Sequence, residues 1–499
     1  MSKIIKYGFY AVFAAIFGFT IFKLFLVDFL PEKTDEYGVK HAELLRVAYP
    51  EEPLTIDPTD SETAVRQRTV NIYEPLVKLD KNFQMRPNLA ISWGMLDELT
   101  WEFNLRPGVK FHDGSDFNSK DAAASIERAK SYEPSELKDM MASIKEISIV
   151  DDLTLKITTE KPDPLLLQRL SYVFMIPSED STKAVTEPVG TGPYKFQEWV
   201  QHEKMTFVAN ENYWGAKPKF KKVEMTPYVD KSGRVSDFLH GKSDFLAFVP
   251  FDGIEEVKKR DFEVVTVPSL EVQFLLFNLG KLSDVNLRRA ISLAVDQKFF
   301  EMNAYVHGIN QFVSPGVFGY NPKISSHRFD FEKATKILEE NGLKGKTVTF
   351  HLYKGQEYLG EYLRKQLDAI GLNLVVSYLE GADMEESLKN GKGDIYFFGF
   401  RADLGDSNDF FNIVIRTGAD FNAGGYSNPE VDALIDASSV EMNLEKRRDM
   451  LQNLMKVVVE DDVFGVPLLE YDIVMSFSNK FSYEPRLDGF IYFDDIIVK

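Results

Sequence analysis

The chain has 499 residues, 44% of them hydrophobic, which exceeds what one hydrophobic core normally fills and indicates two or three domains. Its 77 acidic residues outnumber its 58 basic residues to give a net charge of −19, which argues against nucleic acid as a partner, because phosphate binding needs clustered cations. The absence of cysteine excludes disulfides, thiolate metal sites, cysteine nucleophiles and a lipid anchor on an N-terminal cysteine.

The N-terminal segment has the layout of an export signal. Lys3 and Lys6 precede an apolar run over residues 7–22; Lys23 and the apolar residues 24–27 follow, and then a polar turn around residues 31–35. Such a run is typical of a signal peptide or of a membrane-spanning helix. No small-residue cleavage site follows it, so we predict that residues 1–30 form an uncleaved transmembrane anchor, with a cleaved signal peptide as the alternative. Residues 31–43 would be a linker, and the body would face the periplasm or the cell exterior.

Strand and helix patterns alternate along the rest of the chain, which predicts a mixed α/β fold. Asn118 with Asp121 forms a capping-box pattern, and Gly342 and Gly371 stand where a left-handed C-terminal cap is favoured. We expect strands at residues 44–49, 109–112, 154–158, 205–208, 264–267, 274–277, 347–352 and 374–378. We expect helices at residues 118–130, from 284 in a segment ending near 308, at 331–341 and 357–370, from 429, and around 447–458.

Four sets of motifs follow one another along the chain. They are NIYEPLVKLD at 71–80 with residues 87–93 and 103–114; GTGPY at 190–194 with NYWG at 212–215; residues 277–278 with DVNLRRAISLAVD at 284–296; and residues 402–403 with GYSNPEVD at 425–432. In order and spacing they resemble the periplasmic oligopeptide- and dipeptide-binding proteins, family 5 of the substrate-binding proteins of ABC transporters. Without the resemblance, the motifs indicate turns and core packing rather than chemistry. Gly190 and Gly192, for example, allow the backbone to cross between sheets where side chains would not fit.

The resemblance implies a two-lobed periplasmic-binding-protein fold of type II, in the peptide-binding subclass, with an extra small domain inserted. Lobe I would comprise residues 44–70, 190–268 and 470–499, and the inserted domain residues 71–189. Lobe II would comprise residues 270–468. Strands near 268–274 and 467–472 would cross between the lobes as hinges, so that a ligand touching both lobes favours the closed form.

Three neighbouring residues are the candidate ligand-binding site. Asp403 matches the aspartate that pairs with the ligand's ammonium group in peptide-binding relatives; alternatively it orders the turn that follows or caps the next helix. Arg401 could meet a ligand carboxylate, or form a structural ion pair. Phe400 could line an apolar cleft wall, or belong to a buried strand. Relatives often carry tryptophan at that position, so the ligand class is left open.

These features predict a receptor rather than an enzyme. The seven histidines are scattered without the spacing of metal ligands, and we interpret His112 as a structural residue. We therefore expect no metal, cofactor or catalytic residue. The expected function is that of a monomeric receptor that captures a peptide or similar small solute and delivers it to an ABC permease in the cytoplasmic membrane. The alternatives are a ligand-sensing receptor with a signalling partner and, less favoured, a hydrolase that uses the cleft.

Overall fold

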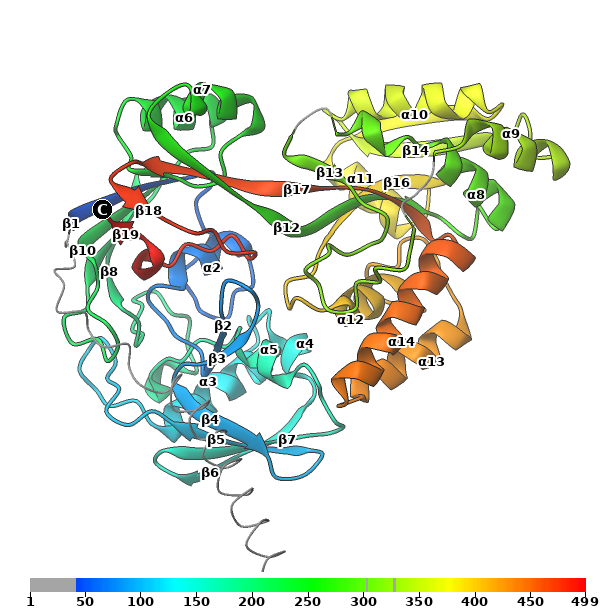
Figure 1. Cartoon of the computed structure of the whole chain (residues 1–499). Helices are drawn as coiled ribbons and strands as arrows, with labels where there is room; N and C mark the ends of the chain where they lie inside the picture. Colours follow the sequence, from blue (N-terminus) through cyan, green and yellow to red (C-terminus); the bar gives the residue numbers. More distant parts are fainter. Residues whose placement is uncertain (1–41, 302–303, 326–328) are drawn as a thin grey trace, which may run out of the picture.

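The computed structural model describes residues 42–301, 304–325 and 329–499. Two α/β bodies lie side by side and are joined by a pair of long strands (Figure 1). The predicted anchor over residues 1–30 lies outside the described residues, as does nearly all of the predicted linker. Within the described part, every helix is too short or too polar to cross a membrane.

Helices and strands alternate from residue 42 to the C-terminus. The helices are α2 Thr63–Thr69, α3 Ser119–Ser131, α4 Lys138–Met141, α5 Leu166–Leu170, α6 Lys231–Leu239, α7 Ile254–Lys258, α8 Val285–Ala294, α9 Phe331–Glu340, α10 Glu357–Ala369, α11 Gly381–Lys389, α12 Ser407–Phe410, α13 Pro429–Val440 and α14 Leu444–Lys456. The strands are β1 Ala42–Tyr49, β2 Val77–Leu79, β3 Met85–Pro87, β4 Ala90–Met95, β5 Thr100–Leu105, β6 Ile144–Asp151, β7 Thr154–Thr159, β8 Tyr194–Val200, β9 Lys204–Ala209, β10 Phe220–Pro227, β11 Phe245–Leu246, β12 Phe262–Phe277, β13 Val306–Gly308, β14 Thr347–Tyr353, β15 Asn373–Leu379, β16 Ile395–Arg401, β17 Gly465–Ser478, β18 Phe481–Ser482 and β19 Ile497–Val498.

One sheet runs through both bodies. Over the described residues its strand order is β15-β14-β16-β12-β17-β11-β1-β10-β9-β8, and β13 pairs with β17 off this path. The two central strands, β12 and β17, pair antiparallel from Phe262 with Ser478 to Leu276 with Gly465. They form the bridge between the bodies (Figure 1), and their register shifts between Pro268 and Val272. A proline in a central strand is tolerated at such an irregularity, because it has no N–H to donate.

The first body contains two packed units. Strands β1 and β8–β11 bury a core that includes Phe207, Phe220 and Phe245, and the C-terminal segment contributes Phe493 to it. A separate four-stranded sheet, in the order β4-β5-β7-β6, packs against α3 through residues such as Phe103 and Ile126. This second unit forms the end of the first body farthest from β12 and β17 (Figure 1).

The second body has a layer of helices on each face of its sheet. Leu275 and Phe277 of β12 pack with α8, α9 and α10. The intervening Phe274 and Leu276 pack with α11 to α14 on the opposite face. This separation follows from the period-2 alternation of side chains along a strand. The cores therefore divide between the two bodies, while the predicted domain boundaries themselves stay a prediction.

Most element ends follow the sequence signals. Asn118 and Asp121 form the expected capping box at the start of α3. Gly342 and Gly371, after α9 and α10, have φ of +63° and +91°, as a left-handed cap requires.

Three expected elements differ from the structure. The predicted strand at 109–112 is a turn, because glycines at 108 and 114 with positive φ reverse the chain and leave one bridge, from Lys110 to Asp116. The helix after Asp284 ends at Ala294, and residues 306–308 form β13 instead. The strands expected at 264–267 and 274–277 are one strand, β12, because its pairing with β17 continues past Pro268.

Candidate ligand-binding site

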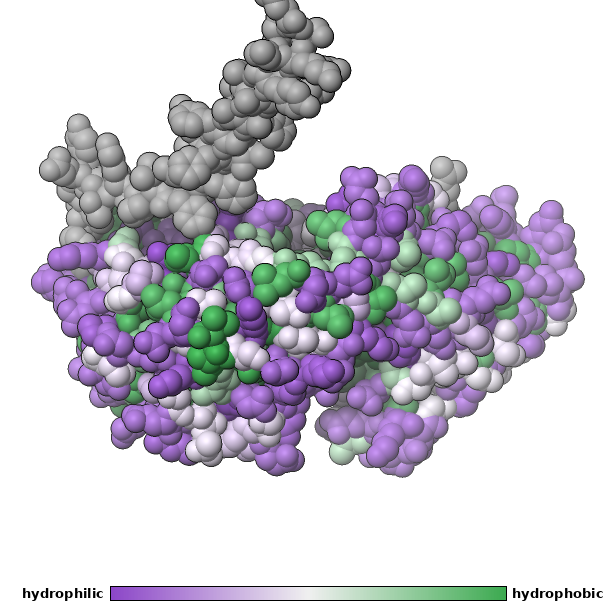
Figure 2. Space-filling view, turned by 90° about the horizontal axis from the view of Figure 1, so that it is seen from below, coloured by the Kyte–Doolittle hydropathy of each residue, from purple (hydrophilic) through white to green (hydrophobic). Residues whose placement is uncertain are grey.

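A pocket lies where the first body meets the second, and a notch separates the two bodies at one edge of the molecule (Figure 2). It holds about 390 Å³ of free space, including the part open to solvent. Distant segments line it: α2, the β2–β3 hairpin, residues 171–174, Asp403 after β16, and residues 486–492 near the C-terminus. Only the tertiary fold brings these segments together.

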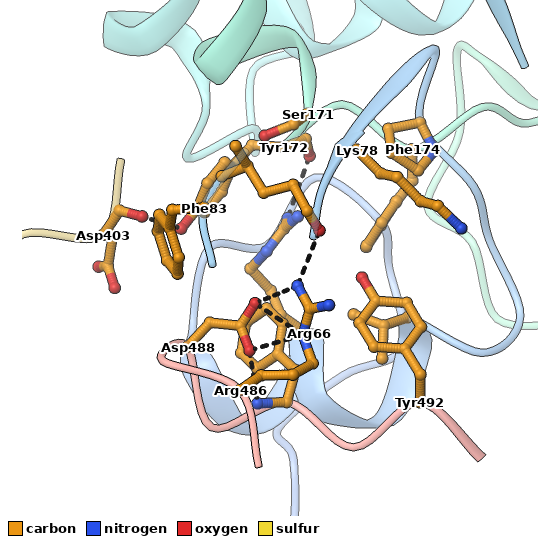
Figure 3. A pocket seen from close by; sticks show the side chains of 14 residues that line it. Arg66, Lys78, Phe83, Ser171, Tyr172, Phe174, Asp403, Arg486, Asp488 and Tyr492 are labelled. Atoms are coloured by element: carbon orange, nitrogen blue, oxygen red, sulfur yellow. Dashed lines mark hydrogen bonds and ion pairs between the residues drawn. The ribbon is translucent and has the colours of Figure 1, made fainter. Parts of the chain in front are cut away.

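Asp403 faces this pocket and is already paired. Its carboxylate Oδ1 lies 2.7 Å from Nε of Arg401, and its side chain remains 45% exposed. Its carbonyl oxygen accepts a hydrogen bond of 3.0 Å from the hydroxyl of Tyr172 (Figure 3). The capping role considered for Asp403 belongs to Asp406, whose side chain accepts from the backbone N–H of Asn408 at the start of α12.

Arg401 lies behind Asp403 and outside the pocket lining. Besides its ion pair with Asp403, its Nη2 donates to the carbonyl of Asp488 at 2.6 Å. Burial lowers the pKa of Arg401, but the neighbouring acidic groups, Asp403 first among them, together outweigh burial, so the pKa is raised. Arg401 therefore stays charged and makes the structural ion pair that was the alternative to ligand contact.

Phe400 is a packing residue at the end of β16. Its ring meets Phe410 edge-on at 5.2 Å, and it packs against the core of the second body. It does not line the pocket. Of the three predicted site residues, Asp403 alone reaches the pocket, and a role in ligand binding remains a prediction for all three.

The pocket contains a charged residue that the sequence did not single out, Arg66 of α2. Arg66 is 3% exposed, and its Nη1 donates to the carbonyl of Tyr172 at 3.1 Å. The rings of Tyr172 and Phe174 lie 4.3 and 4.5 Å from its guanidinium carbon. Burial lowers its pKa, and no acidic side chain among the described residues forms an ion pair with it. No local motif marks Arg66, because its partners lie about a hundred residues away in sequence.

The far wall of the pocket comes from the C-terminal segment. Arg486 and Asp488 form an ion pair of 2.7 Å, and Nη2 of Arg486 donates to the carbonyl of Leu79 (Figure 3). Burial lowers the pKa of Arg486, but the charge and hydrogen bonds of Asp488, with Tyr492 and Asp495, together outweigh burial and raise the pKa. The ring of Tyr492 lies 4.6 Å from the Arg486 guanidinium carbon. The charges of Arg486 and Asp488 on this wall therefore neutralise each other.

Hydrogen bonds and packing join the two bodies at the pocket. Tyr172 donates to the Asp403 carbonyl, Arg401 donates to the Asp488 carbonyl, Phe83 packs on Gly405, and Leu487 packs against the core of the second body. A Cβ on Gly405 would lie 2.5 Å from Cδ1 of Phe83. Phe83 itself has a φ of +59°, which is strained for a bulky residue. Such strain persists where surrounding contacts fix it, here at the tip of the β2–β3 hairpin.

Nothing in the described part of the chain is arranged as a metal centre, since no three His, Asp or Glu side chains gather there. His112 has a structural place instead. Its Nε2 lies 2.9 Å from the carbonyl of Gly192, and its Nδ1 accepts from the N–H of Gly190. It thus ties the 103–114 motif to the 190–194 motif.

Comparison with known proteins now gives the family. The model of the bacterial extracellular solute-binding proteins, family 5 (middle), matches residues 84–422, more than half of the chain. The chain belongs to this family.

Curated relatives of this solute-binding protein are named for different ligands. It is 27% identical over 408 residues to a glutathione-binding protein of Pectobacterium atrosepticum, covering 76% of this chain and 79% of the relative. It is 25% identical over 454 residues to a heme-binding protein of Haemophilus influenzae, covering 81% and 83%. It is also 25% identical over 413 residues to a dipeptide-binding protein of Escherichia coli, covering 74% and 77%.

Solved structures share the fold of the solute-binding protein. A periplasmic binding protein of Helicobacter pylori in complex with the peptide STSA has a TM-score of 0.75 at 22% identity, covering 92% of this chain and 98% of that chain. A substrate-binding protein of Listeria monocytogenes has a TM-score of 0.84 at 20% identity, covering 92% and 100%. The α/β two-lobed periplasmic-binding-protein fold expected from the sequence is therefore confirmed.

Family membership also confirms the class of function. The family comprises extracellular solute-binding proteins, and the relatives are named as binding proteins and not as enzymes. The solute-binding protein thus acts outside the cytoplasm and binds a peptide or a similar small ligand.

Proposed function

We propose that the protein is the receptor of an ABC importer, which closes on a peptide or similar small solute and delivers it to a permease in the cytoplasmic membrane. The observation that carries this proposal is the pocket between the two bodies, which the first body lines with residues of several segments and the second body with Asp403. A solute bound there contacts both bodies, and its differential affinity for the closed arrangement favours closure.

Strands β12 and β17 are the proposed hinge. These two strands carry the chain between the bodies (Figure 1). The register shift between Pro268 and Val272 interrupts their ladder where the bodies meet. Residues at such an irregularity can absorb changes in φ and ψ while the paired segments on each side stay rigid.

Asp403 is the proposed partner of a ligand ammonium group. Asp403 belongs to the pocket lining, Arg401 pairs with its carboxylate, and a carboxylate has lone pairs for more than one donor. In this proposal Arg401 orients Asp403, and Phe400 packs the strand end that holds both. The proposal also includes the predicted domain boundaries. Lobe I comprises residues 44–70, 190–268 and 470–499, the inserted domain residues 71–189, and lobe II residues 270–468.

Residues 1–30 are the proposed membrane tether. This tether would raise the effective concentration of a monomeric receptor near its permease. The rival function is a ligand-sensing receptor of the same fold. Loss of solute uptake when the protein is deleted supports the importer, whereas intact uptake with a lost cellular response supports the sensor.

Native mass spectrometry of the purified protein tests solute capture. We expect a co-purified small molecule that is released intact on denaturation, because a buried pocket that touches both bodies retains its ligand. An empty protein that is also not stabilised by peptide, metal or sugar libraries would contradict the proposal and favour a partner protein instead.

A further inference from the structure

The charge of Arg66 is not compensated within the pocket. Its side chain carries five N–H donors, and the one hydrogen bond it makes goes to the carbonyl of Tyr172. Its Nε is buried without an acceptor. Within residues 42–301, 304–325 and 329–499, no carboxylate oxygen lies within 4.0 Å of its guanidinium nitrogens. An isolated buried cation is costly unless something else supplies the counter-charge.

Two other buried arginines have carboxylate partners, whereas Arg68, 2% exposed, has no ion pair among the described residues and donates to Gln67 and to the carbonyl of Glu51. Arg128 meets Asp57 at 2.7 Å, and Arg447 meets Asp406 at 2.6 Å, each with a side chain 1% exposed. Arg234 resembles Arg66 in lacking acceptors for Nε and Nη1, but it does not line the pocket. Arg66 therefore combines two properties: free donors and a position on the ligand-facing wall.

The residues around Arg66 hold its guanidinium group in place but do not neutralise its charge. The aromatic rings of Tyr172 and Phe174 attract the cation but accept no in-plane hydrogen bond. Figure 3 shows Arg66 between Tyr172 and the Arg486–Asp488 pair, with Lys78 on the neighbouring wall. Lys78 also has no ion-pair partner among the described residues.

The lining as a whole carries excess positive charge although the chain is strongly acidic. Its cations are Arg66, Lys78 and Arg486, and its carboxylates are Asp403 and Asp488. Both carboxylates are already paired, with Arg401 and Arg486. The cations of the lining that have no ion pair within 4.0 Å among the described residues are thus Arg66 and Lys78; Glu74, Asp494 and Asp495, outside the lining, lie near enough to interact with the charge of Lys78.

We propose that Arg66, assisted by Lys78, binds an oxyanion group of the captured solute, a carboxylate or a phosphate. The planar fork of an arginine matches both groups with two parallel hydrogen bonds. This inference rests on the proposed solute capture and narrows it: the protein selects solutes with an acidic group, and a zwitterion can place its ammonium group at Asp403.

Calorimetric titration of three probes tests the inference: trialanine, trialanine amide and glycerol 3-phosphate. We expect the wild type to bind trialanine at least about tenfold more tightly than the amide, the scale of a hydrogen bond to a charged group. Arg66→Met should abolish this preference. Arg234→Met, which removes an equally buried arginine away from the pocket, should keep it. Glycerol 3-phosphate distinguishes a phosphate site from a carboxylate site.

Equal affinity of the wild type for acid and amide would overturn the inference, and so would an intact preference in Arg66→Met. Failure to bind either acidic probe would also overturn it. None of these results touches the capture proposal, which fails only if no co-purified or added solute binds at all.

Thermal unfolding without added solute gives a second, independent readout. Arg66→Met should melt at or above the wild-type temperature, because it removes an uncompensated buried charge. Arg128→Met should melt well below it, because it strands Asp57. A loss of stability in Arg66→Met as large as that in Arg128→Met would show that Arg66 is structural, and would overturn the inference.

Discussion

At the scale of single residues, Asp403 forms a structural ion pair and is also partly exposed to solvent. Arg401 holds Oδ1 at 2.7 Å, yet the side chain is 45% exposed. An ionised carboxylate offers about four lone-pair sites, so a ligand ammonium can bind without displacing Arg401. The same pairing also limits how much the ligand can gain from Asp403.

Asp403→Asn should weaken binding of an ammonium-bearing solute by about 1–3 kcal/mol, since it removes a charge-assisted hydrogen bond at a partly exposed site. Titration of trialanine and N-acetyl-trialanine into the wild type and the variant measures this. The variant should lose affinity for trialanine only, and Asp252→Asn, on the exposed surface, should change neither affinity. An unchanged trialanine affinity in Asp403→Asn would exclude the ammonium role.

His112 makes stability depend on pH. Burial lowers its pKa to about 4, and protonation of Nδ1 would break the hydrogen bond from Gly190. The unfolded chain takes up this proton below about 6.5, so the unfolded state binds more protons between the two values. The free energy of unfolding should therefore fall by about 2–3 kcal/mol as the pH drops from 6.5 to 4.

Urea denaturation across this pH range tests the contribution of His112. His112→Gln retains a donor and an acceptor but cannot be charged, so its unfolding free energy should fall less steeply than that of the wild type. His240→Gln, at the exposed end of α6, is the matched control and should follow the wild type. Parallel curves for wild type and His112→Gln would refute the assignment.

Sequence analysis reached part of the site. Asp403 was found because a motif marks it, and the structural alternative for Arg401 was stated because the two charges stand close in sequence. Arg66 was missed, because its environment is built by Tyr172 and Phe174, and its contact with Tyr172 spans 106 residues. Lack of a partner is a property of tertiary structure, and no local pattern encodes it.

At the scale of elements, the 190–194 motif lies against the chain segment after α2. The carbonyl of Ile72 accepts from the N–H of Gly192 at 2.8 Å, and a Cβ on Gly190 would lie 2.1 Å from that carbonyl oxygen. Glycine is therefore required for the close approach that the sequence analysis expected. This contact connects the β-sheet of the first body to the segment that carries Arg66.

Gly190→Ala should destabilise the protein by at least about 2 kcal/mol, because backbone must move to accommodate the methyl group. Gly94→Ala is the control, since no atom lies within 4 Å of the added Cβ and its φ is ordinary. Chemical denaturation should place Gly94→Ala within about 1 kcal/mol of the wild type. Equal stability of the two variants would contradict the close approach.

Helix ends were more predictable than strand ends. The capping box at Asn118 and the glycines after α9 and α10 act within four or five residues, so local sequence is enough to place them. The extent of β12 depends on its pairing with β17, some two hundred residues away. Pro268 in the middle of β12 suggests a break in the strand when the sequence alone is considered. For the same reason residues 109–112 have a strand-like composition but no strand to pair with.

At the scale of the whole molecule, the two bodies meet at the pocket through hydrogen bonds and apolar packing. Tyr172 and Arg401 each donate a hydrogen bond to a main-chain carbonyl of the opposite body, and Phe83 and Leu487 pack against the core of the second body. Such contacts add little free energy singly, so the arrangement of the bodies is open to control by a ligand that binds both.

Energy transfer between dyes on the two bodies tests the central claim most directly. Because the chain lacks cysteine, Lys161→Cys in the first body and Glu445→Cys at the start of α14 place the labels without further substitutions. Titration with trialanine should raise the transfer efficiency to a plateau. The midpoint of this curve should agree with the dissociation constant measured by calorimetry, and Arg66→Met should shift the midpoint to higher trialanine concentration. An efficiency that stays constant while calorimetry reports binding would contradict closure on the solute.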